Sequence, residues 1–225
     1  MKNYFFIFFL LLTVNVFSQT TVSKQLSDFS TLKTYSGIDV ELIKSPEQKI
    51  VITGDMAENV KIKNVQQTLR ISFPFFKTPS KSKVKVTIYY NKEIKVIDAN
   101  EGSSITAQNF EQTTVTIKTQ EGAYINMTIA VKNLTVKAVS EGIIKLTGTS
   151  KNSSIEASTG GAFHGFELKN SNVCKVSAGL GGKAEVYSLE TLEAKVSFGG
   201  SIFYKGTPED LKTKKVLGGS IEPKN

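Results

Sequence analysis

The sequence predicts an all-β protein built as a β-solenoid, and three observations carry this prediction. Glycines recur at intervals of 18 to 21 residues from Gly102 to Gly219. The apolar residues between them alternate with polar ones, which is typical of strands that bury one face. No stretch after the N-terminal segment sustains an apolar stripe at the helical period. A unit of about 20 residues with two strands cannot bury its own apolar face, whereas a stack of such units can.

Length and composition limit the chemistry that the chain can carry. The chain has 225 residues, a formal net charge of +8, one His, one Cys and no Trp. Its hydrophobic content of 40% is enough for a packed core, and its length fits a single domain. One His and one Cys exclude a His/Cys metal cluster and an internal disulfide framework. We therefore expect no metal site of that type and no cofactor.

Residues 1–18 are predicted to be a signal peptide. Lys2 precedes an apolar run from Tyr4 to Leu12, and a small residue, Ser18, ends the segment before Gln19. The run is shorter than the roughly 20 residues that a spanning helix needs. We expect an exported chain that starts near Gln19, has no transmembrane span after cleavage, and lies in the periplasm, on the outer surface or in the medium.

Residues 19–100 are predicted to form irregular strands at one end of the coil. Alternating stretches begin near Tyr35 and Lys49, and a hairpin is expected where Val60–Lys63 and Leu69–Phe73 bracket a polar turn. Two further strands, Val84–Tyr89 and Ile94–Ile97, lead into the first repeated glycine. Two interpretations stay open: these strands are imperfect early turns of the coil, or they form a cap that covers its open end.

Residues 101–222 are predicted to form the regular repeats, in a right-handed parallel β-helix-like coil. Each unit has one strand after its glycine and one before the next, as in Ile105–Ala107 and Val115–Ile117. Glycine at a repeated corner permits a positive φ or close approach of neighbouring turns. An antiparallel β-sandwich is the alternative, but a meander of hairpins has no need for the same corner residue in every unit. No linker divides the chain, so residues 19–225 are treated as one domain.

Several segments together resemble a known family. The opening Phe29–Val40, the strand Val84–Ile88, the Glu-Gly corners and the closing Gly199–Pro208 with Gly218–Ile221 are similar to the auto-transporter adhesin head GIN domain. The similarity covers roughly residues 25–222. The resemblance implies an exported bacterial protein with a β-helical fold. The resemblance does not imply an enzymatic activity or a catalytic residue in this chain.

The residues with reactive or ionisable side chains do not match a known catalytic motif. His164 is expected to be a surface or corner residue without a catalytic partner, and Cys174, within a strand, to be a packing residue. Glu101, Glu121 and Glu141 follow one repeat spacing, so a coil would stack them about 4.8 Å apart. Such a column either binds a cation such as Ca²⁺ or is a solvated ladder offset by lysines. We expect no catalytic residue and no enzyme.

A segment around residues 73–83 is the strongest candidate for contact with a partner. Its aromatic and basic residues are Phe73, Phe75, Phe76, Lys77, Lys81 and Lys83. Two prolines break the strand pattern there, so part of the segment is expected to be a loop. The aromatic residues either insert into a partner or pack over an end of the coil.

The hypothesis for function is an exported, non-enzymatic module that acts at the cell envelope or surface. An envelope glycan or a surface protein is the expected partner, and lysines at outward strand positions form either a solvated face or a basic surface for anionic polymers or lipid headgroups. Nucleic acid is excluded, because the chain is exported and has a single Arg and no recognition module. Two alternatives are a carbohydrate-active enzyme on the same coil, which needs clustered carboxylates, and a purely structural envelope protein.

Overall fold

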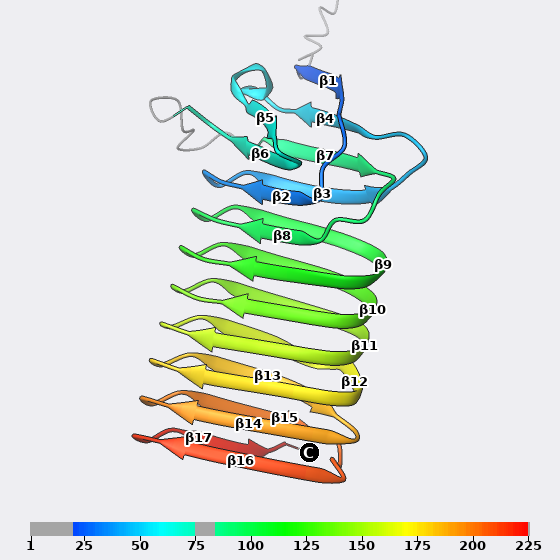
Figure 1. Ribbon diagram of the computed structural model, residues 1–225. Coiled ribbons are helices and arrows are strands. Elements are labelled where there is room, and N and C mark those ends of the chain that lie inside the picture. The colour runs from blue at the N-terminus through cyan, green and yellow to red at the C-terminus, as the bar shows by residue number, and fades with distance from the viewer. Residues whose placement is uncertain (1–19, 75–83, 225) are drawn as a thin grey trace, which may run out of the picture.

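The computed structural model describes residues 20–74 and 84–224. These residues form a β-solenoid of about 7 turns, with coils of about 19 residues and no α-helix. In Figure 1 the strands nearest the viewer run to the left, and the chain returns behind them while it descends, so the coil is right-handed. The predicted fold class is confirmed, and the sandwich alternative is excluded by the parallel pairing of successive coils.

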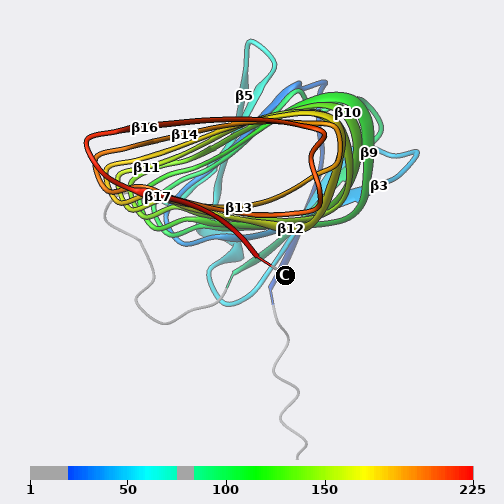
Figure 2. The ribbon, with the colours of Figure 1, turned by 90° about the horizontal axis from the view of Figure 1, so that it is seen from below.

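Each regular coil has two strand faces that enclose the core. We call the strands that follow the glycine corner face A and those that precede it face B. The first four regular strands bend through both faces; they are β9 (Ser104–Thr119), β10 (Tyr124–Ala138), β11 (Ile143–Ser158) and β12 (Ala162–Gly179). The later coils are divided into β13 (Lys183–Ser188), β15 (Ser201–Lys205) and β17 (Ser220–Pro223) on face A, and β14 (Thr191–Ser197) and β16 (Asp210–Val216) on face B. Seen along its axis, the molecule is a flattened ring (Figure 2).

The core lies inside the ring and is built from columns of stacked side chains. Alternation along each strand points every second residue inward. Face A contributes a column in which each member is 0% exposed: Ile105, Ile125, Ile144, Phe163, Ala184 and Ile202. Face B contributes a second buried column: Val115, Leu134, Ser153, Cys174 and Leu192. Stacking therefore buries what no single coil could bury alone.

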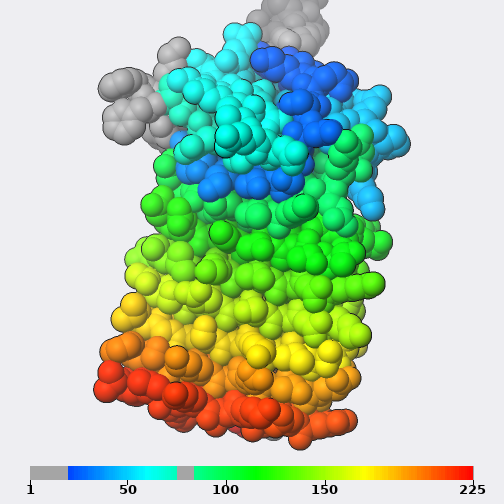
Figure 3. All heavy atoms as spheres, in the orientation of Figure 1, coloured from blue at the N-terminus to red at the C-terminus, as the bar shows by residue number. Residues whose placement is uncertain are grey.

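The N-terminal strands continue the parallel stack and add antiparallel strands at its end. They are β1 (Thr21–Gln25), β2 (Thr31–Thr34), β3 (Asp39–Lys44), β4 (Lys49–Thr53), β5 (Lys61–Val65), β6 (Thr68–Ser72), β7 (Lys85–Tyr90) and β8 (Val96–Ala99). β1 pairs antiparallel with β4, and β4 with β7, while β5 and β6 form the expected hairpin. A short 3-10 helix, η1 (Ala57–Asn59), precedes β5. The space-filling view has this blue and cyan layer on top of the bands of coils (Figure 3).

The first coil of the sequence is not the outermost coil of the structure. β2 lies between β6 on one side and β8 on the other. Its continuation β3 lies in the same way between β7 and β9. The chain therefore forms one coil, adds the next strands above it, and then passes below it to begin the regular stack. Both interpretations of the N-terminal strands thus hold in part. β2–β3 is a true coil, β6 and β7 pair with it in parallel, and the antiparallel strands β4 and β5 cover β7 and β6.

The corners that lead from face B to face A correct the glycine alignment made from the sequence. Each contains two consecutive residues with positive φ, and Gly102 and Gly122 take the second place. Gly142 and Gly161 instead lie one residue later, against the backbone of the preceding coil. A Cβ on Gly161 would meet the carbonyl oxygen of Ala138 at 2.1 Å. The repeated glycines thus occupy two adjacent positions with two different physical reasons for having no side chain.

The same shift corrects the expected column of three glutamates. Glu101 and Glu121 do occupy equivalent positions, with φ of 52° and 55°. In the next coil Ser140 takes that position, and Glu141 lies one residue further on. The sequence spacing of 20 residues concealed this, because the coil that ends at Glu141 is one residue shorter than its neighbour.

Candidate basic interaction face

A row of basic side chains follows the axis of the solenoid on the outside of face B. It arises because one outward position is basic in most coils and the strands pair in register. The positions in spatial order are Lys63, Arg70, Lys33, Asp98, Lys118, Lys137, Glu156, Ser177, Lys195 and Lys214. We call its seven basic members the basic row. Neighbouring strands place them about 4.8 Å apart per step.

Most of the charge of the basic row is not neutralised within the protein. Lys33 Nζ lies 3.2 Å from Asp98 Oδ2, and Lys137 Nζ lies 3.6 Å from Glu156 Oε2. The remaining five members, Lys63, Arg70, Lys118, Lys195 and Lys214, form no ion pair with a carboxylate of residues 20–74 or 84–224. Arg70 stacks on the ring of Tyr35, 4.5 Å from its centre, which leaves its charge available. The row therefore presents a line of positive potential.

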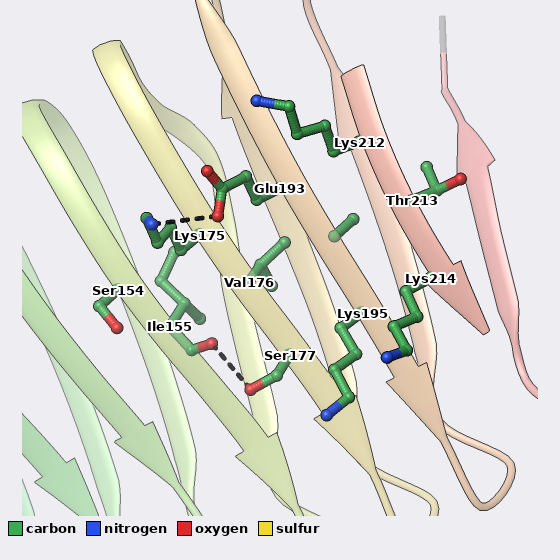
Figure 4. A pocket seen from close by; sticks show the side chains of 11 residues that line it. Ser154, Ile155, Lys175, Val176, Ser177, Glu193, Lys195, Lys212, Thr213 and Lys214 are labelled. Atoms are coloured by element: carbon green, nitrogen blue, oxygen red, sulfur yellow. Dashed lines mark hydrogen bonds and ion pairs between the residues drawn. The ribbon is translucent and has the colours of Figure 1, made fainter. Parts of the chain in front are cut away.

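The C-terminal end of the basic row borders a shallow hollow of about 340 Å³ on face B. Small side chains, Ser154 and Ser177, form its floor next to longer ones. Four lysines and one carboxylate line it: Lys175, Lys195, Lys212, Lys214 and Glu193. Figure 4 has these residues on β11, β12, β14 and β16, with Lys175 Nζ paired to Glu193 Oε2 at 3.1 Å. The hollow is therefore positive overall and open to an extended ligand.

The contact segment predicted from the sequence is only partly described. Phe73 is 7% exposed and packs in the hydrophobic core, which matches the packing alternative for this residue. The other members, Phe75, Phe76, Lys77, Lys81 and Lys83, lie outside the described residues. The contact hypothesis for those five stays a prediction.

His164 has a partner that the sequence reasoning missed. Its Nδ1 lies 2.8 Å from Glu185 Oε2, and Lys183 Nζ lies 2.7 Å from the other oxygen of the same carboxyl. Burial raises the pKa of Glu185, but the hydrogen bonds from Lys183 and His164 outweigh burial and hold this pKa below the usual 4.5. The two residues are paired across β12 and β13, one coil apart. A search at one coil length after His164 could have found Glu185.

Cys174 behaves as the packing residue that its strand context predicts. Its side chain is 0% exposed, and burial raises the pKa of its thiol to about 12. A thiolate at neutral pH and an exposed disulfide to another molecule are both excluded by this environment. His164 lies on the outward side of face A, so the two residues do not form a catalytic pair.

Residues 20–74 and 84–224 contain no group of three or more His, Cys, Asp or Glu side chains placed to hold a metal ion. The same residues contain no helix that is long and apolar enough to cross a membrane.

Comparison with known proteins identifies the family. Three bacterial proteins of known structure, each described as a putative adhesin, share the fold. The one from Bacteroides fragilis NCTC 9343 has a TM-score of 0.81 and 18% identity, over 93% of this chain and 98% of that one. The one from Parabacteroides merdae ATCC 43184 has a TM-score of 0.66 and 20% identity, over 92% and 96%. The one from Parabacteroides distasonis ATCC 8503 has a TM-score of 0.59 and 21% identity, over 92% and 97%.

Sequence comparison is more specific than these structural likenesses. No curated protein matches the chain significantly. The model of the family described as "Putative auto-transporter adhesin, head GIN domain" matches residues 28–208, which includes the corners up to Gly199, the basic row up to Lys195 and the closing stretch Gly199–Pro208. The chain belongs to this head GIN domain family.

Proposed function

We propose that this chain is an exported, non-enzymatic adhesin-like module that binds an acidic polymer of the cell envelope along the basic row. The single observation that carries the proposal is the line of cationic side chains, five of them without a carboxylate partner in the described part of the chain. A rigid face with several cationic side chains in line along its axis suits an extended ligand, because one polymer chain can contact several of them at once. Family membership and the adhesin descriptions of the structural neighbours support a surface role.

The enzyme alternative rests on a second hollow, on face A. It measures about 240 Å³ and is lined by His164, Glu167 and Glu185 among others. Glycoside hydrolysis needs a carboxylic acid whose pKa is raised so that it can protonate the leaving group. The pKa of Glu185 is instead lowered by its contacts with Lys183 and His164, so its carboxyl stays ionised at neutral pH. This favours a binding role over hydrolysis.

The proposal is tested by titrating residues 19–225 with polygalacturonate and with neutral dextran of similar length. We expect calorimetry to detect binding to the acidic polymer alone, with an affinity that falls steeply as salt is added. The triple variant Lys118→Gln, Lys195→Gln and Lys214→Gln removes three unpaired charges of the basic row. We expect it to weaken binding at least about tenfold, which corresponds to about 1.4 kcal/mol.

A matched control removes the same charge elsewhere. Lys132, Lys145 and Lys169 are exposed and lie away from the basic row. Their triple change to Gln should alter the affinity less than about twofold, since distant charges are screened in salt. Equal loss in both triple variants, or no binding of wild type to any acidic polymer, refutes the proposal.

A further inference from the structure

Three large apolar side chains project from one edge of the molecule, at the corners of its last coils. They are Leu180, Phe198 and Leu217, which we call the corner ridge. Their exposed fractions are 59%, 55% and 72%. The three occupy the same corner position in successive coils, so they stack along the solenoid axis where face B turns into face A. The corners between the two faces form one edge of the stack (Figures 1 and 2).

The backbone at the corner ridge does not explain these residue types. Leu180, Phe198 and Leu217 have φ of 49°, 47° and 53°. This left-handed conformation suits Asn or Gly and is unfavourable for bulky residues. Earlier coils place polar residues at the equivalent position, including Glu101 and Glu121. Large apolar residues here strain the turn, and more than half of the surface of each stays exposed, so their chemistry points to a partner.

The surroundings of the corner ridge are basic. The stretches 177–183, 195–201 and 214–220, centred on the three residues, contain four lysines and no acidic residue: Lys183, Lys195, Lys214 and Lys215. Lys183 is paired with Glu185, so the other three lysines supply the charge for a partner. Figure 4 has the Lys195 and Lys214 side chains directed toward the C-terminal ends of β14 and β16, from which the corners follow. Apolar side chains next to lysines are typical of proteins that bind a bilayer surface. The apolar side chains insert among the lipids, and the ammonium groups bind the anionic headgroups.

We propose that the corner ridge docks the protein on an anionic lipid bilayer, with Leu180, Phe198 and Leu217 inserted among the headgroups and acyl chains. The complementary charge of the flanking lysines favours this occupant. The shape also favours it, since the residues are exposed at a convex edge. Three side chains provide only a small part of the roughly 800 Å² per partner that a stable protein interface buries. The proposal shares Lys195 and Lys214 with the basic row, but it rests on the apolar side chains of Leu180, Phe198 and Leu217, which polymer binding does not use.

The test is sedimentation of residues 19–225 with vesicles, which leaves the apolar segment 1–18 out of the measurement. Vesicles of phosphatidylethanolamine with phosphatidylglycerol are compared with vesicles of phosphatidylcholine alone. We expect wild type to bind the anionic vesicles and to bind the neutral ones at least about tenfold more weakly. The triple variant Leu180→Asn, Phe198→Asn and Leu217→Asn should lose at least about tenfold in binding to the anionic vesicles. Because Asn tolerates the left-handed conformation, its Tm should equal or exceed that of wild type.

Two further variants keep the result specific to the corner ridge. Val65→Thr, Tyr124→Thr and Ile143→Thr remove three other exposed apolar side chains and should leave vesicle binding unchanged. The chain has no Trp, so Phe198→Trp introduces a single reporter. Its emission should shift to the blue with anionic vesicles and be quenched by brominated acyl chains. The proposal is overturned if wild type does not bind the anionic vesicles or if the Asn variant binds them as wild type does. It is also overturned if wild type sediments as a dimer and the Asn variant as a monomer.

Discussion

At the residue scale, adjacent corner glycines have different reasons for being glycine. Gly181 has φ of +72° with open space where a Cβ would lie, so its requirement is conformational. Gly182 needs no positive φ, but a Cβ there would meet the carbonyl oxygen of Ala157 at 2.2 Å. Its requirement is the close approach of two coils. In the sequence the two kinds look alike, because a glycine does not reveal which of the two constraints it satisfies.

Substitution by Ala should separate the two constraints. Gly181→Ala places an ordinary residue in the left-handed conformation and should cost about 1 to 2 kcal/mol. Gly182→Ala forces two coils apart and should cost about 3 kcal/mol or more. Urea unfolding of both variants against wild type measures the difference. Equal losses of unfolding free energy would mean that backbone contact does not determine the second position.

At the element scale, the coils are held together by polar columns as well as apolar ones. At the broad corner opposite the glycines, Asn152 Nδ2 donates to Asn133 Oδ1 at 3.1 Å, and Asn172 Nδ2 donates to Asn152 Oδ1 at 3.0 Å. A buried counterpart lies inside: Asn170 is 1% exposed and accepts a hydrogen bond from the Ser153 hydroxyl. Its amide donates to the Tyr187 carbonyl at 2.8 Å, which joins β12 to the next coil.

The buried and exposed asparagines should differ in their contribution to stability. Asn170→Ala removes the Oδ1 acceptor of the Ser153 hydroxyl and the amide donor to the Leu168 and Tyr187 carbonyls inside the corner, and should cost about 3 kcal/mol. Asn152→Ala breaks two hydrogen bonds that water can replace, so it should cost no more than about 1 kcal/mol. Thermal and urea unfolding measure both effects. An Asn170 variant as stable as the Asn152 variant would show that the interior of this corner admits water.

At the scale of the whole molecule, the two ends of the stack differ. The N-terminal coil β2–β3 is enclosed between two layers, and antiparallel strands complete its environment. At the other end, β16 pairs with β14 alone and is largely exposed along its length. Its lysines Lys212, Lys214 and Lys215 hinder edge-to-edge pairing with another sheet. In a linear stack each coil depends on its neighbours, so stability should fall toward this end.

Hydrogen exchange read by mass spectrometry should resolve this gradient. Peptides from β16 and β17 should exchange at least about a hundredfold faster than those from β2 and β3, although all four are strands. Intermediate coils such as β11 should fall between or near the protected end. Uniform protection from β2 to β17 would mean that the solenoid unfolds as one cooperative unit and would remove the basis for this prediction.

The sequence by itself determined the fold class, because inward and outward alternation and a corner every 18 to 21 residues leave stacking as the way to bury the apolar face. It also identified Cys174 as a packing residue and the β5–β6 hairpin. Only the tertiary structure decided which residues become neighbours across coils. A coil one residue longer or shorter shifts every later equivalence, and bulges in β12 add further shifts. For this reason Glu141 does not stack with Glu101 and Glu121, and His164 lies next to Glu185. The basic row and the corner ridge can be recognised only when the alignment of several coils is known. Local alternation of apolar and polar residues does not determine that alignment.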